Sequence, residues 1–175
     1  MMINRFKYTE SEMKQILSSM TIICDSREQQ CSHVTEWFDK KKIPYISKKL
    51  DWGDYSFFIP ANLELGIIKP TYYDKEITIE RKGCLDEIIG NFVERDRIES
   101  EFLRHKGKMH IIIEDSTYAD MYEGRYQSKY ASKSAIGSLH SMADRYDLNF
   151  IFSDKDYTAK YIFCTFYYYL RNRIK

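Results

Sequence analysis

The chain has 175 residues, of which 43% are hydrophobic and 30% are charged. This length and composition predict one folded domain with a packed core and exclude a disordered chain. The formal net charge of +1 gives no overall basic signature of nucleic-acid binding. No apolar stretch is long enough for a membrane span, and no apolar signal segment begins the chain. The four scattered cysteines fit neither a zinc site nor a disulfide framework, so a cytoplasmic protein without a membrane partner is expected.

The first part of the chain predicts two helices, three strands and an irregular insertion. Thr9 is a candidate N-cap for the first helix, and the first strand (TIICD) ends in the carboxylate of Asp25. The insertion contains Gly66 and Pro70 and has no hydrophobic period, so it is predicted to be a loop. In chain order these elements are helix 8–20, strand 21–25, helix 32–42, strand 45–48, strand 55–59 and loop 61–75.

Strands and helices alternate in the rest of the chain. The run EITIER alternates apolar and polar residues as a strand does, and apolar residues recur at helical spacing over 85–103, in one long helix or two short ones. The further elements are strand 76–81, helix or helices 85–103, strand 109–114, short helix 118–122, helix 131–146, strand 148–152 and helix 156–173. With no internal repeat and no linker, this alternation predicts a three-layer α/β fold with a central mixed β-sheet flanked by helices.

Four carboxylates lie at the ends of predicted strands or just beyond them: Asp25, Asp54, Glu80 and Asp86. Burying such groups together is costly, and a hard divalent cation such as Mg²⁺ or Mn²⁺ offsets the cost. Lys82 follows Glu80 by two residues, so both side chains lie on one face of an extended segment. Metal-assisted phosphodiester hydrolysis uses this set of groups, with Arg27, Arg81 and Arg97 available to contact phosphates. A second interpretation stays open, in which the charges pair with one another at the surface.

Three stretches, IICDSRE, GDYSF and ERKGCLD, together resemble the nuclease domain of the XPF/Hef family of structure-specific endonucleases. The signature of that family is a Gly-Asp pair, a variable spacer and then Glu-Arg-Lys-x-x-x-Asp. Here it is formed by Gly53-Asp54, the spacer 55–79, Glu80-Arg81-Lys82 and Asp86. The resemblance continues through HIIIEDS and SAIGSLHSMADRYDLNFIFS. It implies a restriction-endonuclease-like fold, with 1–20 as an N-terminal helical extension and 21–175 as a single nuclease domain.

The resemblance also implies roles for the residues of the signature. Asp54 and Glu80 are implied to bind the metal ion, Asp25 to be a third acidic contributor, and the backbone carbonyl of Arg81 to be a further ligand. Lys82 is implied to be the catalytic lysine. The implied cofactor is Mg²⁺ or Mn²⁺.

Further residues are implied to support this site. Arg27 and Asp86 are expected to support it directly, and Glu28 to lie behind it. The family also uses an arginine after the signature helix, for which ERDRIESEF offers Arg95 and Arg97. Arg97 is favoured, because the apolar residues that follow it best match the spacing of the family.

The function implied is that of a metal-dependent DNA endonuclease that cuts at or near branched DNA, such as a flap, a fork or a recombination intermediate, and leaves 5′-phosphate ends. One alternative is a four-way-junction resolvase that makes paired cuts. Another is a non-cleaving DNA-binding or scaffold module. The intact set Asp54, Glu80 and Lys82 favours an enzyme, because a scaffold does not need clustered carboxylates.

Many family members carry a helix-hairpin-helix domain that grips DNA, and no such domain is expected in this chain. DNA contacts are then expected on the surface of the nuclease domain itself. The candidate basic clusters are 40–42, 48–49, 104–108 and 171–175. Stand-alone forms resemble small proteins carried by phages of Gram-positive bacteria, in which case the location is the host cytoplasm. The sequence has no Gly-rich phosphate loop, so no nucleotide cofactor is expected.

The last predicted helix, with the run YIFCTFYYYL, is apolar on more faces than one sheet contact requires. One interpretation is that a second copy of the chain covers part of it. The other is that its apolar side chains fill the core while the Tyr hydroxyls reach solvent. Family members pair through their nuclease domains, so a homodimer is expected.

Overall fold

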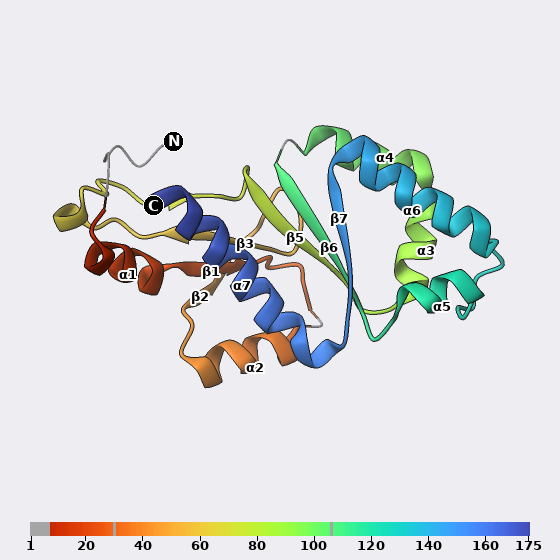
Figure 1. Ribbon diagram of the computed structural model, residues 1–175, viewed down its shortest axis with the longest axis horizontal. Helices are drawn as coiled ribbons and strands as arrows, with labels where there is room; N and C mark the ends of the chain where they lie inside the picture. Colours follow the sequence, from red (N-terminus) through yellow and green to blue (C-terminus); the bar gives the residue numbers. More distant parts are fainter. Residues whose placement is uncertain (1–7, 30, 106) are drawn as a thin grey trace. The chain divides into compact units, whose positions relative to one another are not determined.

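The computed structural model describes residues 8–29, 31–105 and 107–175 (Figure 1). Its helices are α1 (Glu10–Ser19), α2 (Ser32–Lys41), α3 (Leu85–Val93), α4 (Arg95–Arg104), α5 (Tyr118–Glu123), α6 (Ser132–Tyr146), α7 (Lys155–Ile174) and the short 3₁₀ helix η1 (Leu63–Leu65). Its strands are β1 (Thr21–Cys24), β2 (Tyr45–Ser47), β3 (Tyr55–Ile59), β4 (Thr71–Tyr72), β5 (Ile77–Lys82), β6 (Lys108–Glu114) and β7 (Leu148–Ser153). These bounds confirm the predicted alternation of helices and strands. None of the helices in the described part of the chain is long and apolar enough to cross a membrane.

The chain forms two compact units. The first unit is the chain through Ile77 together with Ala159–Lys175, and the second is Thr78–Thr158. The expected division into a 1–20 extension and a 21–175 domain stays a prediction. Residues 1–7 of that extension lie outside the described residues, as does Lys106 of the basic cluster 104–108.

In the first unit, β1 pairs with β2 in parallel and with β3 in antiparallel orientation, so the sheet is mixed. Helix α7 packs its apolar stripe on this sheet, and Ile162, Phe166 and Leu170 are fully buried. The ring centroid of Phe57 in β3 lies 5.2 Å from the ring centroid of Phe166. The Phe57 ring also stacks on the Tyr73 ring, with 4.5 Å between the two centroids. The core of this unit is therefore an aromatic layer between β3 and α7.

Helix α1 begins at the predicted N-cap. The Thr9 side chain accepts a hydrogen bond from the backbone N–H of Glu12, and the Glu12 carboxylate accepts one from the backbone N–H of Thr9. This reciprocal capping box fixes the start of the helix. Ile16 and Leu17 are its buried residues.

The segment 61–75, predicted to be a loop, instead extends the sheet. Phe58 and Ile59 of β3 pair with Tyr72 and Thr71 of β4, and Gly66 turns the chain between them at φ +73°. The rings of Phe58 and Tyr72 stack at 5.1 Å. A strand of two residues is too short to show a hydrophobic period, so the sequence pattern alone missed it.

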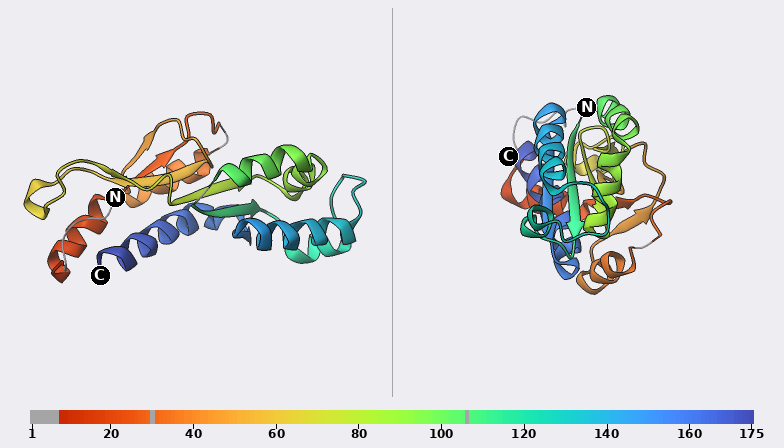
Figure 2. Two further views of the ribbon diagram at one scale, coloured as in Figure 1. Left: turned by 90° about the horizontal axis from the view of Figure 1, so that it is seen from above. Right: turned by 90° about the vertical axis from the view of Figure 1, so that its right-hand side faces the viewer.

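The second unit is built on β6, whose residues Ile111, Ile112 and Ile113 are almost completely buried. The strand order is β5-β6-β7, and β6 and β7 run parallel from Met109↔Leu148 to Glu114↔Ser153. Figure 2 shows α3 and α4 on one side of β6 and α6 on the other. The segment 85–103 thus forms two helices, which confirms one of the two predicted alternatives.

We expect two histidines of the second unit to make its stability depend on pH. Burial lowers the pKa of His105, and both burial and the nearby Lys108 lower the pKa of His110. Above the unfolded-state pKa of about 6.5 both histidines are neutral in the folded and in the unfolded chain, and the full stability of the fold is present. As the pH falls from there through the lower folded-state pKa, stability is lost, because the unfolded chain takes up these protons more readily than the folded one.

We therefore expect the free energy of unfolding to fall as the pH is lowered from about 7 toward 5. Urea unfolding across this range measures the slope for the wild type and for the His105→Gln/His110→Gln variant. The variant is expected to show a smaller slope. Equal slopes for the two proteins would remove these histidines as the cause.

Candidate active site

The pairing of β1 with β3 brings two of the predicted carboxylates together. Cys24, the last residue of β1, is opposite Tyr55, the first residue of β3. Because the strands are antiparallel, the next residue after β1 and the residue before β3 lie side by side. These residues are Asp25 and Asp54, and the Asp25 backbone N–H donates to the Asp54 carbonyl oxygen at 2.7 Å.

The backbone conformation explains why a glycine stands before Asp54. Gly53 has φ +67°, in the left-handed region that costs an L-residue energy but is open to glycine. The turn at Gly53 leads directly into β3 and places Asp54 at the strand's start. Gly53 therefore allows the turn that places Asp54 directly before β3.

Asp25 is 3% exposed, and donors surround both of its carboxylate oxygens. Oδ1 accepts from the backbone N–H of Arg27 at 2.7 Å and from its Nε at 3.0 Å. Oδ2 accepts from Arg27 Nη2 at 2.7 Å and from the Leu50 backbone N–H at 3.0 Å. Burial alone would raise the pKa of Asp25, but the hydrogen bonds from Arg27 and Leu50 outweigh it and lower this pKa. Asp25 thus holds two loops at the end of β1, and its implied contribution to metal binding stays a prediction.

Arg27 completes this arrangement. Its Nη2 also donates to the Leu50 carbonyl oxygen at 2.8 Å, while its side chain remains 62% exposed. The Glu28 backbone N–H donates to the Asp25 carbonyl oxygen at 3.1 Å and closes the turn. The motif DSRE is therefore a tight, charged turn that offers a guanidinium group to solvent.

Strand β5, in the second unit, carries Glu80 and Lys82, the residues expected to act in catalysis. Lys82 Nζ lies 2.7 Å from Glu80 Oε1, which confirms that the two side chains share one face of the strand. Glu80 is 27% and Lys82 15% exposed. The ammonium group is thus half enclosed beside a carboxylate, where it can contact an incoming anionic oxygen without being fully solvated.

Arg81 points to the opposite face of β5, as the alternation of side chains along a strand requires. Its Nη1 lies 2.7 Å from Oε2 of Glu114 at the end of β6, and the two side chains are 6% and 1% exposed. The Arg81 side chain therefore belongs to the core, which leaves its backbone carbonyl for the ligand role implied by the resemblance. Glu114 was not among the predicted site residues, although its place at the end of the apolar run HIIIE was a usable signal.

Asp86 lies in the first turn of α3 and anchors the loop between α5 and α6. Its Oδ1 accepts from the backbone N–H groups of Gln127 at 2.8 Å and Ser128 at 3.3 Å. An acidic residue is also electrostatically favourable at this end of a helix. Asp86 thus joins the start of α3 to this loop, and its expected support of the site stays a prediction.

The two candidate arginines of α4 take part in ion pairs along the helix. Arg97 contacts Glu94 at 2.7 Å and Glu101 at 3.5 Å, and its side chain is 55% exposed. Arg95 contacts Glu99 at 2.7 Å. Arg145 of α6 contacts the same Glu99 carboxylate at 3.0 Å. Both arginines are engaged in the same way, so the preference for Arg97 stays a prediction.

The donor set suits Mg²⁺ chemically. Mg²⁺ is commonly held by one or two carboxylates and keeps several waters, so the side chains of Asp54 and of Glu80 are each a donor of the kind that it uses. Among residues 8–29, 31–105 and 107–175, no group of three or more His, Cys, Asp or Glu side chains is placed to hold a metal ion. Asp54 belongs to the first unit and Glu80 to the second.

Comparison with known proteins gives the family of the chain. A family model described as the ERCC4 domain matches residues 24–165. None of the curated proteins that were compared matches the chain.

Two solved structures of XPF from Aeropyrum pernix are similar in fold. One has a TM-score of 0.60 at 19% identity and covers 83% of this chain and 59% of that chain. The other, a complex with DNA, has a TM-score of 0.62 at 19% identity and covers 89% of this chain and 67% of that chain. The match supports the restriction-endonuclease-like fold, and this chain spans 59% of the first of these structures. Because the family model extends from the end of β1 into α7 and so matches most of the chain, the chain belongs to the ERCC4 domain family.

Proposed function

We propose that the chain is a DNA endonuclease that depends on Mg²⁺ or Mn²⁺ and hydrolyses phosphodiester bonds at or near branched DNA. Flaps, forks and recombination intermediates are the proposed substrates. One observation carries this proposal: Glu80 and Lys82 form a half-enclosed pair on one face of β5, within the Glu-Arg-Lys motif of an ERCC4 domain. The similarity to a structure of XPF in complex with DNA supports the choice of polymer.

The proposed roles follow from the chemistry of each group. Asp54 and Glu80 would hold the cation, with Asp25 and the Arg81 carbonyl as the further contributors implied by the resemblance. When bound, the ion lowers the pKa of a coordinated water and so supplies the nucleophile at neutral pH. The ammonium of Lys82 would offset the negative charge that develops on the phosphate oxygens in the transition state.

Three further residues would support the reaction without taking part in bond making. Arg27 offers an exposed guanidinium that can contact a flanking phosphate. Asp86 would hold the start of α3, and Arg97 would contact a phosphate from α4. Attack of water on phosphorus would break the bond between phosphorus and O3′; the phosphate would stay on the 5′ side, and O3′ would take up a proton to become a 3′-hydroxyl.

Cleavage of end-labelled flap, fork, four-way-junction and plain duplex DNA tests the proposal. We expect cutting of at least one branched substrate with Mg²⁺ or Mn²⁺ and none with EDTA. The products are expected to be ligatable, because a 5′-phosphate and a 3′-hydroxyl are left. Cutting that persists in EDTA would contradict the metal requirement.

The same experiment separates the alternatives. Paired, symmetric cuts in the four-way junction would identify a resolvase. Binding of branched DNA without cutting under any metal condition would identify a scaffold module. The homodimer, the cytoplasmic location and the phage origin stay predictions.

A further inference from the structure

A row of aromatic rings runs over α2 and α7 of the first unit. We call it the aromatic ladder; it consists of Trp37, Phe163, Tyr167 and Tyr168. The Trp37 and Phe163 rings are 6.4 Å apart, those of Phe163 and Tyr167 5.6 Å, and those of Tyr167 and Tyr168 5.3 Å. Phe163 and Tyr167 are neighbours because residues four apart share one side of a helix.

The core of the unit does not require these rings. Ile162, Phe166 and Leu170 provide the fully buried stripe of α7. Trp37, Phe163 and Tyr167 are only half-buried, and Tyr168 is 53% exposed. Figure 1 shows α2 beside α7 within this unit. The ladder therefore presents a partly exposed aromatic surface that packing alone leaves unexplained.

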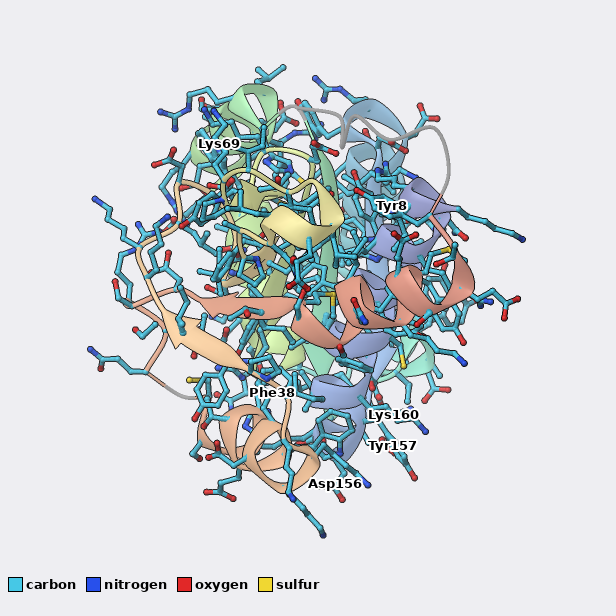
Figure 3. All side chains as sticks on the ribbon, turned by 90° about the vertical axis from the view of Figure 1, so that its left-hand side faces the viewer. Tyr8, Phe38, Lys69, Asp156, Tyr157 and Lys160 are labelled. Atoms are coloured by element: carbon cyan, nitrogen blue, oxygen red, sulfur yellow. The ribbon has the colours of Figure 1, made fainter. Side chains whose placement is uncertain are left out.

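Positive charges flank the ladder. Lys160 lies about one turn before Phe163 and Arg171 about one turn after Tyr167, and both are exposed. From Tyr157 to Lys175 the sequence contains basic residues and no acidic residue, and the exposed Asp156 lies one turn before Lys160. Figure 3 shows the Lys160 side chain extending outward from α7. Helix α2 has Lys40 and Lys41 in its last turn and also the exposed carboxylates of Glu36 and Asp39.

This charge pattern disfavours a second copy of the chain as the occupant. In an antiparallel pair of α7 helices, Lys160 of one copy would face the Arg171 end of the other. In a parallel pair each cation would face its own equivalent. Both arrangements place like charges together, which costs free energy. A polyanion with flat apolar groups matches the surface instead.

We propose that the aromatic ladder binds single-stranded DNA, with bases stacked on its rings and phosphates near Lys160 and Arg171. Aromatic rings beside cations are the usual means of binding a single strand without sequence preference. The choice of DNA rests on the proposed function, because an enzyme that cuts near branches must meet a single strand beside the duplex. The ladder then serves as a holding site for that strand.

Fluorescence anisotropy of fluorescein-labelled oligo(dT) tests the proposal in EDTA, with the full-length Lys82→Ala protein as the parent. Trp37→Leu and Tyr167→Leu keep apolar volume but remove an aromatic face. Each is expected to weaken binding by ~5- to 150-fold, the range for loss of one stacked base. Tyr122→Leu, in α5 at a position 66% exposed, is the matched control and is expected to bind like the parent. Circular dichroism of each variant verifies the fold.

Neutralising the flanking charges provides a second, independent readout. Lys160→Ala/Arg171→Ala is expected to reduce the slope of log affinity against log salt by ~0.7 to 1.4, because one or two phosphate contacts to a single strand are lost. An unchanged slope together with unchanged binding by the Leu variants would overturn the proposal. So would light scattering that shows the Leu variants dissociating a dimer while oligo(dT) binding is unaffected.

The outcome also separates this proposal from the proposed function. Wild-type cleavage of branched DNA with normal oligo(dT) binding by the Leu variants would overturn the ladder and leave the nuclease. Loss of oligo(dT) binding in the Leu variants, with no cleavage by the wild type, would support the ladder and remove the nuclease.

Discussion

Lys82→Ala is expected to lower the rate of branched-DNA cleavage by ~10²–10³-fold while the protein still folds and binds DNA. The reason is the place of Lys82 Nζ, 2.7 Å from Glu80 on β5 and only 15% exposed. Removal of the ammonium takes away the fixed positive charge that, in the proposed mechanism, stabilises the transition state. Single-turnover cleavage of a labelled flap at saturating protein measures the chemical step, and anisotropy measures DNA binding.

Lys69→Ala is the matched control for the lost charge, because Lys69 is exposed in the insertion and has no proposed catalytic role. It is expected to cut like the wild type.

Asp54→Asn tests the other half of the proposed site. We expect a loss of cleavage rate comparable to that of Lys82→Ala. DNA binding is expected to be retained or improved, since one negative charge that repels phosphate is removed. A Lys82→Ala protein that cuts at the wild-type rate would remove Lys82 from the mechanism.

The buried pair Arg81 and Glu114 gives the largest expected effect on stability. Arg81→Met is expected to lower the free energy of unfolding by about 3–5 kcal/mol, because it removes the cation that lies 2.7 Å from the almost fully buried Glu114 carboxylate. Urea unfolding followed by circular dichroism measures the change. The double variant Arg81→Met/Glu114→Leu is expected to recover most of the loss, because an apolar pair can replace a buried ion pair.

Arg97→Met is the matched control for this prediction. It breaks the exposed ion pair with Glu94, which is worth about 0–1 kcal/mol at most. A loss below about 1 kcal/mol in Arg81→Met would show that the pair contributes no more than a surface pair. A double variant as unstable as the single would mean that the packing around Arg81, and not its charge, maintains the core.

Local features of the structure could be predicted from the sequence, because they depend on neighbouring residues. The shared face of Glu80 and Lys82 follows from the period of two along a strand. The start of α1 follows from Thr9 and Glu12, which form the capping box. The identity of the signature residues came from the resemblance, since charge patterns alone left open a surface of paired ions.

Long-range contacts could not be predicted in this way. Arg81 meets Glu114 across 33 residues of sequence, and Asp86 meets the backbone of Gln127 across 41 residues. Such pairs depend on which strands and loops become neighbours, and a hydrophobic period carries no information about this. The hydrogen bonds around Asp25 were missed for a related reason: its donor Leu50 lies in a different loop.

The most direct test of the central claim is single-turnover cleavage of one end-labelled flap by the wild type in Mg²⁺, beside the wild type in EDTA and Lys82→Ala in Mg²⁺. The account predicts cutting in the first reaction alone. Equal cutting in all three reactions would contradict the assignment of this chain's β5 motif as a metal-dependent nuclease site.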